Sequence, residues 1–164
     1  MGNEIGSIEK LEAHQKGVLH KAFSILIFND DDEILLQQRA FTKYHTPGLW
    51  SNSCCSHPHP KELLTNAAHR RLVEELGFNT DLKEEFSFVY KFYDQITKLW
   101  EHEHDTVYTG IYNGEIPFNP EEINAVKWVK ATELDTWMKN SPKEFTFWFK
   151  EFYNEMLERN LITL

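Results

Sequence analysis

The stretch SNSCCSHPHP, residues 51–60, places both cysteines of the chain beside two histidines. These residue types can form a disulfide, bind zinc, supply a nucleophile or proton donor, or simply fill the core. Side chains of an extended segment alternate between two faces, so Cys55 and His57 share one face and Cys54 lies on the other. The same alternation disfavours a disulfide between neighbouring cysteines. We therefore expect Cys55 and His57 to face a common site and Cys54 to pack as a small hydrophobe.

The segment WEHEH, residues 100–104, carries a second pattern with a period of two. Glu101 and Glu103 share one face of an extended chain, and His102 and His104 share the other. Taken alone, two carboxylates in this spacing are also typical of a solvated strand edge.

Histidines and carboxylates from four places in the chain together form a mixed nitrogen and oxygen ligand set. Such a set suits a divalent metal of borderline or hard character, namely Zn²⁺, Mn²⁺ or Mg²⁺, with five or six ligands. A zinc finger is excluded, because it needs further thiols in paired C-x₂-C spacing. The first two histidines flank QKGVL, which we predict to be a loop. The candidate ligands are His14, His20, His57, Glu101 and Glu103.

Hydrophobic periodicity predicts the strands that must position these residues. Two apolar segments flank the turn NDDDE and predict a hairpin, and later segments are rich in aromatic and β-branched residues. The predicted strands cover residues 22–28, 34–39, 50–57, 86–93, 105–112 and 126–129.

Capping signals predict three helices. The first begins at Thr65 or Asn66 and ends at Gly77, which stands where a left-handed C-cap belongs. A short helix capped by Thr132 follows the last strand, and a longer one starts at Ser141 with a proline and a capping box. Strands, one helix, more strands and then helices predict an α+β domain with a central sheet.

Composition limits the class of protein. The chain has 164 residues, 41% of them hydrophobic and 14% aromatic, which is enough for the core of one domain. A formal net charge of −9 argues against nucleic acid as the main partner but leaves room for a small anionic ligand. The sequence contains no membrane-length apolar run or signal peptide, and its two cysteines favour a reducing compartment. We expect one cytoplasmic domain over residues 1–164 without a membrane partner, and the Met1-Gly2 start suggests a trimmed N-terminus.

The region from Ser56 to Phe78 resembles the Nudix box, G-x₅-E-x₇-R-E-U-x-E-E-x-G-U, in which U is a bulky aliphatic residue. Its matching positions are Glu62, Arg70, Leu72, Glu74, Glu75 and Gly77, with Phe78 at the last bulky one. Ser56 replaces the first Gly, and Arg71 replaces the first Glu of REUxEE. Nudix hydrolases hold Mg²⁺ on these glutamates, so the resemblance implies a helix that holds a diphosphate instead of cleaving it. A surface helix with i,i+4 ion pairs would explain the charges but not Glu62 or Gly77.

With this helix, the cysteine and glutamate motifs closely resemble those of the type 1 isopentenyl-diphosphate isomerases of the Nudix superfamily. The most specific segments are LHKAFS (19–24), PGLWSNSCCSHP (47–58), RRLVEELG (70–77) and EHE (101–103). The resemblance runs from about Lys10 to the C-terminal helix and implies a single-domain, Nudix-type α/β/α sandwich with a mixed central sheet. It also implies metal-dependent interconversion of isopentenyl and dimethylallyl diphosphate by protonation and deprotonation across an allyl unit.

The resemblance further implies a role for each matching residue. The catalytic residues would be two groups on opposite faces of the substrate and the phenol that partners the second: Cys55, Glu103 and Tyr90. The metal ligands would be His14, His20, His57, Glu101 and Glu103, with Glu75 contacting a second ion, an Mg²⁺ bound with the diphosphate. The substrate-binding residues would be Lys10, Arg39, Lys43, Ser56, Arg71 and Trp148, the last covering the hydrocarbon end.

These residue types suit the reaction. Protonating an unactivated alkene forms a tertiary carbocation, which requires an acid on one face, a base on the other and dry walls. An indole face stabilises a nearby cation by roughly 0.5–2 kcal/mol. The alternatives are a Nudix pyrophosphohydrolase acting on a nucleoside diphosphate derivative and a non-catalytic module that binds a metal or a diphosphate. The identity of the metal, the order in which Cys55 and Glu103 act, the oligomeric state, the downstream isoprenoid pathway and a role for His59 stay open at the level of sequence.

Overall fold

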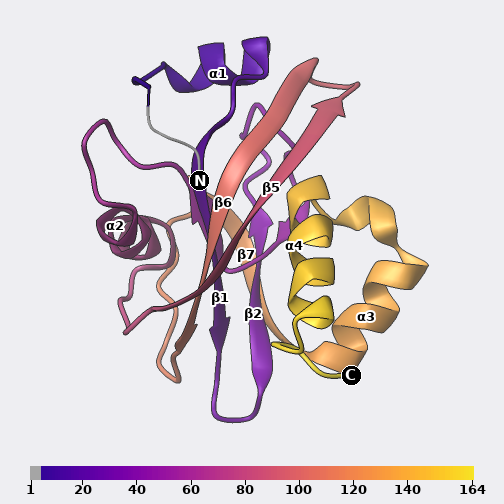
Figure 1. Cartoon of the computed structure of the whole chain (residues 1–164). Helices are drawn as coiled ribbons and strands as arrows, with labels where there is room; N and C mark the ends of the chain where they lie inside the picture. The colour runs from indigo at the N-terminus through magenta and orange to yellow at the C-terminus, as the bar shows by residue number, and fades with distance from the viewer. Residues whose placement is uncertain (1–4) are drawn as a thin grey trace.

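Within the described residues 5–164, a mixed sheet of seven strands carries helices on both faces (Figure 1). The chain is described by a computed structural model, and the expected trimming at Met1-Gly2 lies outside the described residues. The strands are β1 (His20–Phe28), β2 (Glu33–Arg39), β3 (Trp50–Ser51), β4 (Cys54–Ser56), β5 (Lys83–Asp94), β6 (Leu99–Ile111) and β7 (Ile123–Lys130). The helices are α1 (Lys10–Lys16), α2 (Leu64–Leu76), α3 (Ala131–Asn140) and α4 (Phe147–Glu158), with a 3₁₀ turn η1 (Pro142–Glu144).

Strand β1 pairs with three other strands of the sheet. The strand order is β3-β2-β1-β6-β5, with β4 paired to β1 and β7 paired to β2. β1 is antiparallel to β2 and β4 but parallel to β6, in a register that sets His20 opposite Glu103 and Phe28 opposite Ile111. This parallel pairing brings the second histidine of the candidate site beside the EHE segment.

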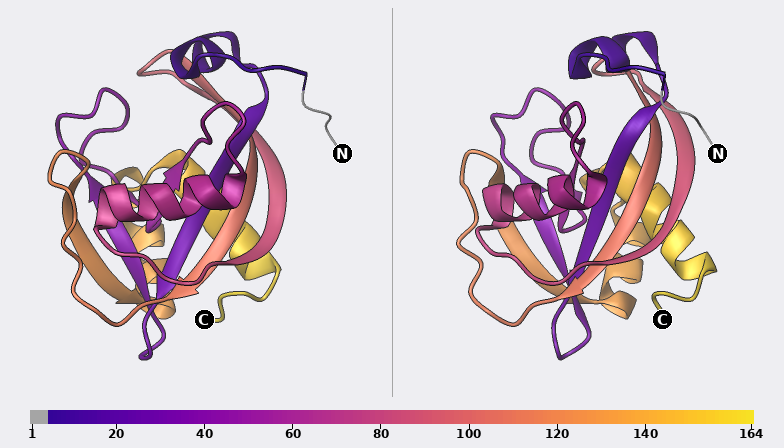
Figure 2. Two further views of the ribbon diagram at one scale, coloured as in Figure 1. Left: turned by 90° about the vertical axis from the view of Figure 1, so that its left-hand side faces the viewer. Right: turned by 60° about the vertical axis from the view of Figure 1, so that its left-hand side comes forward.

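Alternate residues of the strands fill one core on each face of the sheet. Ile25 and Ile27 pack in a cluster with Leu72 of α2, whereas Leu26 packs in a cluster with Phe149 of α4. Figures 1 and 2 show α2 on one side of the sheet and α3 and α4 on the other. The layers confirm the predicted α/β/α sandwich with a mixed central sheet. Among residues 5–164, every helix is too short or too polar to cross a membrane.

The predictions around the first two histidines and the EHE segment are partly wrong. His14 lies on helix α1, whose start is capped by the Glu9 side chain and whose end is Gly17 with φ 63°. Seven residues are too few for a periodic pattern to reveal this helix. Strand β6 already begins at Leu99, so WEHEH lies inside the strand and not before it.

Two predicted N-caps are also wrong, although the predicted C-cap at Gly77 is confirmed with φ 75°. Helix α2 begins at Leu64, and the Thr65 hydroxyl lies 3.4 Å from that of Tyr108 instead of capping the helix. Helix α3 follows β7 directly, so Thr132 lies inside its first turn. All three candidate caps, Thr65, Asn66 and Thr132, thus lie inside the helices that they were expected to cap.

The long helix predicted from Ser141 does not form as one element. The prolyl segment makes only the 3₁₀ turn, and α4 starts after Thr146. The Thr146 backbone N–H donates to the Trp50 carbonyl at 2.9 Å, and Phe145 forms a bridge with Trp50. Pairing with β3 therefore extends the chain at the point where the sequence pattern predicts a continuous helix.

Candidate active site

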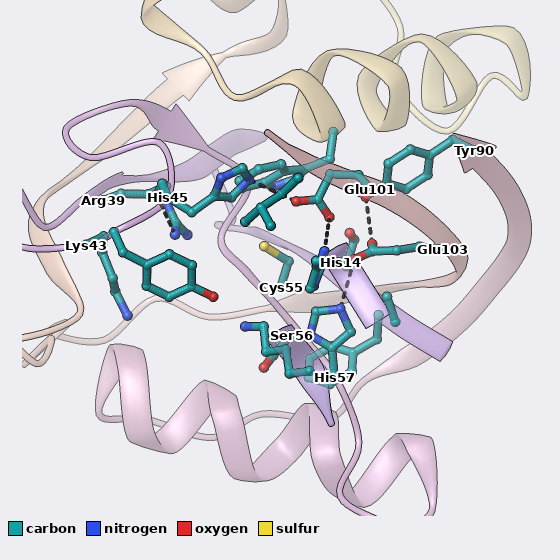
Figure 3. A pocket seen from close by; sticks show the side chains of 17 residues that line it. His14, Arg39, Lys43, His45, Cys55, Ser56, His57, Tyr90, Glu101 and Glu103 are labelled. Atoms are coloured by element: carbon teal, nitrogen blue, oxygen red, sulfur yellow. Dashed lines mark hydrogen bonds and ion pairs between the residues drawn. The ribbon is translucent and has the colours of Figure 1, made fainter. Parts of the chain in front are cut away.

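A pocket that is partly open to solvent lies among α1, β1, β2, β4, β5, β6, α4 and the loop at 40–49 (Figure 3). Most of the predicted site residues line it. They are Lys10, His14, Arg39, Lys43, Cys55, Ser56, His57, Tyr90, Glu101, Glu103 and Trp148. The predicted residues that do not line it are His20, Arg71 and Glu75. His20 still lies next to the pocket through its contact with His57, whereas the other two lie on α2 and pair with each other.

The two cysteines lie on opposite faces of β4, as the alternation predicts. Cys54 is fully buried in the cluster formed with α2, and Cys55 lines the pocket on the side of α4. The antiparallel pairing that sets Cys55 opposite Ser24 of β1 fixes this orientation. Burial, reinforced by the negative charge of Glu75, raises the pKa of the Cys55 thiol to about 12. At neutral pH the group is therefore a protonated thiol.

Four of the five predicted ligands of the metal converge. One ligand atom from each of His14, His20, His57 and Glu103 lies within 4.8 Å of the other three. His14 donates through Nδ1 to the Trp100 carbonyl and His20 through Nδ1 to the Val18 carbonyl, each at 2.8 Å. Because these bonds fix the proton on Nδ1, they leave each Nε2 free as a ligand. Among the described residues, the buried Nε2 of His14 has no hydrogen-bond partner, so the donor set fits a divalent metal.

The charge states of the imidazoles also suit a metal. Burial lowers the pKa of His14 to about 4 and lowers that of His57. Both rings are thus neutral near pH 7, the form that binds a metal. Burial also disfavours the charged form of His20, but the interaction of His20 with Glu103 outweighs burial and raises the pKa of His20.

The two oxygens of Glu103 have different surroundings. Oε1 lies 2.8 Å from Nε2 of His57, and Oε2 accepts a hydrogen bond from the Tyr90 hydroxyl at 2.6 Å. Burial would raise the pKa of Glu103, but His57, His20 and Tyr90 together hold it well below its ordinary value. Burial and the Glu103 charge raise the pKa of Tyr90 well above its ordinary value, so the phenol remains a donor. One oxygen thus faces the histidines while the other is held by the phenol.

Glu101, the fifth predicted ligand, lies at the edge of this group. Its Oε2 is 3.4 Å from Nδ1 of His14, and its Oε1 is 2.8 Å from Nε2 of His45. Burial is the main cause that raises its pKa. The carboxylate therefore lies between two imidazoles, outside the four converging ligand atoms.

Sequence reasoning missed two buried polar residues: His45, which lines the pocket, and Asp105, which bonds to the pocket residue Ser24. Asp105 accepts a hydrogen bond from the Ser24 hydroxyl at 2.7 Å, and burial together with the Glu103 charge raises its pKa well above the ordinary value. Its spacing of two from Glu103 could have placed it on the same strand face. His45 stands in a loop, where no periodicity could have revealed it.

The altered Nudix helix holds a cation among carboxylates. The Arg71 guanidinium lies 2.8 Å from Glu74, 2.5 Å from Glu75 and 3.5 Å from Glu122. Burial would lower the pKa of Arg71, but these carboxylates raise it. Glu122 also pairs with Lys43, one of the cations that line the pocket. The cation expected to bind diphosphate is therefore engaged by the protein's own carboxylates.

The remote Glu62 of the Nudix pattern pairs with Arg70. The guanidinium donates to both of its oxygens, at 2.8 and 2.9 Å. This bidentate bond overcomes a small opposing effect of burial and lowers the pKa of Glu62 to about 2. The pair ties the middle of α2 to the segment before the helix, and the i,i+4 contact of Arg70 with Glu74 is present as well.

Comparison with known proteins agrees with this architecture. A sequence profile described as the NUDIX domain matches residues 18–149. The MutT protein of Methanosarcina mazei Go1 is 18% identical, with a TM-score of 0.68 over 87% of this chain and 95% of that one. The NUDIX domain of Shewanella oneidensis NrtR is 15% identical, with a TM-score of 0.66 over 93% of this chain and 99% of that one. The fold is that of a Nudix domain.

Curated relatives resolve the family within this class. The isopentenyl-diphosphate Delta-isomerase 2 of Photorhabdus laumondii is 47% identical over 152 residues, covering 93% of this chain and 85% of the relative. The protein of the same name from Aromatoleum aromaticum is 46% identical over 150 residues, covering 89% and 77%. The chain belongs to the isopentenyl-diphosphate Delta-isomerase family.

Proposed function

We propose that this chain interconverts isopentenyl diphosphate and dimethylallyl diphosphate. Family membership supports the substrate and the reaction. The observation that carries the proposal is the pocket, in which Cys55 from β4 and the Tyr90–Glu103 pair from β5 and β6 reach the same space (Figure 3). A thiol and a carboxylate that share a pocket in this family suit the two proton transfers of an allylic shift.

The proposed reaction moves a double bond by one carbon. One group adds a proton to the terminal carbon of the alkene, which forms a tertiary carbocation, and another removes a proton from the neighbouring methylene. We assign these roles to Cys55 and Glu103 on opposite faces of the substrate. At Glu103 a proton is held or passed at Oε2, where Tyr90 donates. Such positioned acids and bases contribute roughly 10²–10⁴-fold to a rate.

The Trp148 indole is proposed to cover the hydrocarbon end. Its Nε1 donates to the Ser51 hydroxyl at 3.0 Å, and the Arg39 guanidinium lies 5.3 Å from its ring centroid. The hydrogen bond fixes the plane of a side chain that is only 8% exposed. A fixed, buried indole excludes water and presents an electron-rich face to a carbocation.

A divalent metal is proposed at His14, His20, His57 and Glu103, with Glu101 at the edge. Zn²⁺, Mn²⁺ and Mg²⁺ all suit this donor set. When bound, the ion would neutralise charge at the buried carboxylate and tune its proton affinity. The chain's own contribution is to hold the imidazoles in the ligating tautomer and to keep Oε2 of Glu103 on Tyr90.

The diphosphate is proposed to bind the polar end of the pocket. Lys10, Arg39, Lys43 and Ser56 line the pocket and are proposed to bind the diphosphate, and Arg71 is proposed to contribute from α2. We also propose a second ion, an Mg²⁺ bound with the diphosphate and contacted by Glu75. Oxygens of Glu75 now accept from Arg71 and from Gln37, so binding of Mg²⁺ would have to exchange one of these contacts. The proposed partner is this small diphosphate in the cytoplasm, with no role for nucleic acid or membrane.

The direct test incubates the protein with isopentenyl diphosphate and Mg²⁺, with and without a chelator. We expect dimethylallyl diphosphate as the product and its loss in the chelator. Release of phosphate or pyrophosphate without that product would instead indicate a Nudix pyrophosphohydrolase. A binding module would form no product with either the wild-type chain or Cys55→Ala.

A further inference from the structure

His45 lies in the pocket on the loop between β2 and β3, and its side chain joins several parts of the site (Figure 3). The residue is 8% exposed. Its Nε2 lies 2.8 Å from Oε1 of Glu101, and its Nδ1 lies 3.8 Å from Asp94. Its ring stacks on the Trp148 indole with a centroid distance of 5.5 Å and an interplanar angle of 22°. One side chain thus contacts both the proposed metal end and the proposed hydrocarbon end.

The backbone around His45 is held in an unusual conformation. The Arg39 guanidinium donates two hydrogen bonds to the His45 carbonyl, at 3.3 and 3.1 Å. The next residue, Thr46, has φ 45°, a left-handed conformation that β-branched residues rarely adopt. Strain of this kind persists only where the surroundings fix the chain, and it concentrates at functional sites. The loop therefore places the imidazole in one defined position.

Packing alone does not explain an imidazole at this position. An apolar ring would cover Trp148 equally well and would avoid the penalty of burying two ring nitrogens. The nitrogen edge of His45 instead faces the carboxylates of Glu101 and Asp94. The face and the edge of the ring thus meet different groups.

We propose that His45 is a positioning residue that fixes the Glu101 carboxylate and the Trp148 indole relative to each other. His14 contacts Oε2 of Glu101 and His45 contacts Oε1, so the two rings together set the plane of the carboxylate. Partners of this kind, one step removed from a metal, orient its ligands and tune its affinity. The effect on catalysis rests on the proposed isomerase function, whereas the effect on metal binding does not.

The test compares His45→Ala, His45→Gln and His45→Phe with His59→Ala, which removes an exposed histidine near the pocket. Mn²⁺ affinity is measured by electron paramagnetic resonance on chelator-stripped protein. His45→Ala is expected to weaken Mn²⁺ binding by about 10-fold or more. Its kcat at saturating Mn²⁺ is expected to fall by about 10-fold with little change in KM, because the indole face loses its alignment. His59→Ala is expected to match the wild type in both.

The other two variants distinguish the contribution of the nitrogen edge of the His45 ring from that of its face. Gln keeps a polar group toward Glu101 and is expected to recover most of the Mn²⁺ affinity. Phe keeps a ring on Trp148 and is expected to recover most of kcat but not the affinity. Wild-type behaviour of His45→Ala, or full recovery of both properties by His45→Phe, would overturn the proposal. If the wild-type chain makes no dimethylallyl diphosphate, the proposed function fails, while the Mn²⁺ titrations still decide whether His45 positions Glu101.

Discussion

The histidine–glutamate group beside β6 and the Nudix helix α2 are both rich in ionisable side chains, but the charges of the two regions are compensated in different ways. In the first, four ligand atoms from α1, β1, β6 and the residue after β4 converge within 4.8 Å. In the second, the Arg71 guanidinium lies among the carboxylates of Glu74, Glu75 and Glu122. The first arrangement is ready for an external cation, whereas the second already contains a cation of the chain.

We propose that this difference underlies isomerase chemistry on a Nudix fold. A guanidinium fixed among carboxylates neutralises them but cannot bind and activate a water as a metal ion does. Beside β6, the neutral imidazoles of α1 and of the residue after β4 meet one phenol-bonded carboxylate, and we propose that this buried group combines metal binding with proton transfer. In this proposal the helix keeps the Nudix framework while the reactive groups lie on the strands. Four predictions test this division, in order of decreasing effect.

The largest effect is expected from the two cysteines, which the strand alternation separates. Cys55→Ala should reduce kcat by roughly 10²–10⁴-fold, because it removes a proposed acid–base group. Cys54→Ala should leave kcat nearly unchanged and lower the free energy of unfolding by about 1 kcal/mol, because it only shortens a packed side chain. Product analysis and urea unfolding of both variants measure the two effects. Similar losses of kcat in both would contradict the assignment.

The next effect concerns where a metal binds. Glu103→Gln should weaken Mn²⁺ binding by about 10-fold or more, because it removes an anionic ligand from the converging group. Glu74→Gln, on the half-exposed face of α2, should bind Mn²⁺ as the wild type does. Isothermal titration of the chelator-stripped proteins compares them. A loss of Mn²⁺ affinity in Glu74→Gln alone would indicate that the principal metal site lies on the Nudix helix.

Local patterns predicted an α+β domain with a central sheet, whereas the α/β/α layering and most residues of the pocket came from the resemblance to a family. Alternation separates Cys54 from Cys55, and left-handed Gly77 ends α2, because both depend only on neighbouring backbone geometry. The resemblance to a family assigned roles to residues that the structure brings close together, such as His14 and Glu103.

What the sequence failed to predict depends on distant contacts. The start of α4 depends on Thr146 bonding to Trp50, a contact between segments far apart in the chain. Likewise, the Arg71–Glu122 contact at 3.5 Å joins segments that two further strands separate, so spacing along the chain could not reveal it. The position of His45 is set by a loop with a strained residue, and no periodic pattern encodes such a position.

A smaller effect is expected from the cation on α2. Arg71→Gln should lower the free energy of unfolding by about 1–3 kcal/mol, because it leaves three neighbouring carboxylates without their shared cation. Added Mg²⁺ should restore more stability to this variant than to the wild type, since the cluster can then take up an ion. Lys139→Gln, which breaks an exposed i,i+4 pair, should change stability by less than about 0.5 kcal/mol. Urea unfolding with and without Mg²⁺ provides the comparison, and equal responses of Arg71→Gln and wild type to Mg²⁺ would contradict it.

The smallest effect comes from the pair that ties Glu62 to Arg70. The folded pKa of Glu62, about 2, lies below its ordinary value of 4.5, so the ionised carboxylate stabilises the fold above pH 4.5. This contribution is lost as the pH falls from about 4.5 toward 2, and near the surface it amounts to at most about 1 kcal/mol. Wild-type protein should therefore be more stable than Glu62→Gln at pH 6, with a smaller difference at pH 3. A difference that stays constant between these pH values would mean that Glu62 acts through packing and not through its charge.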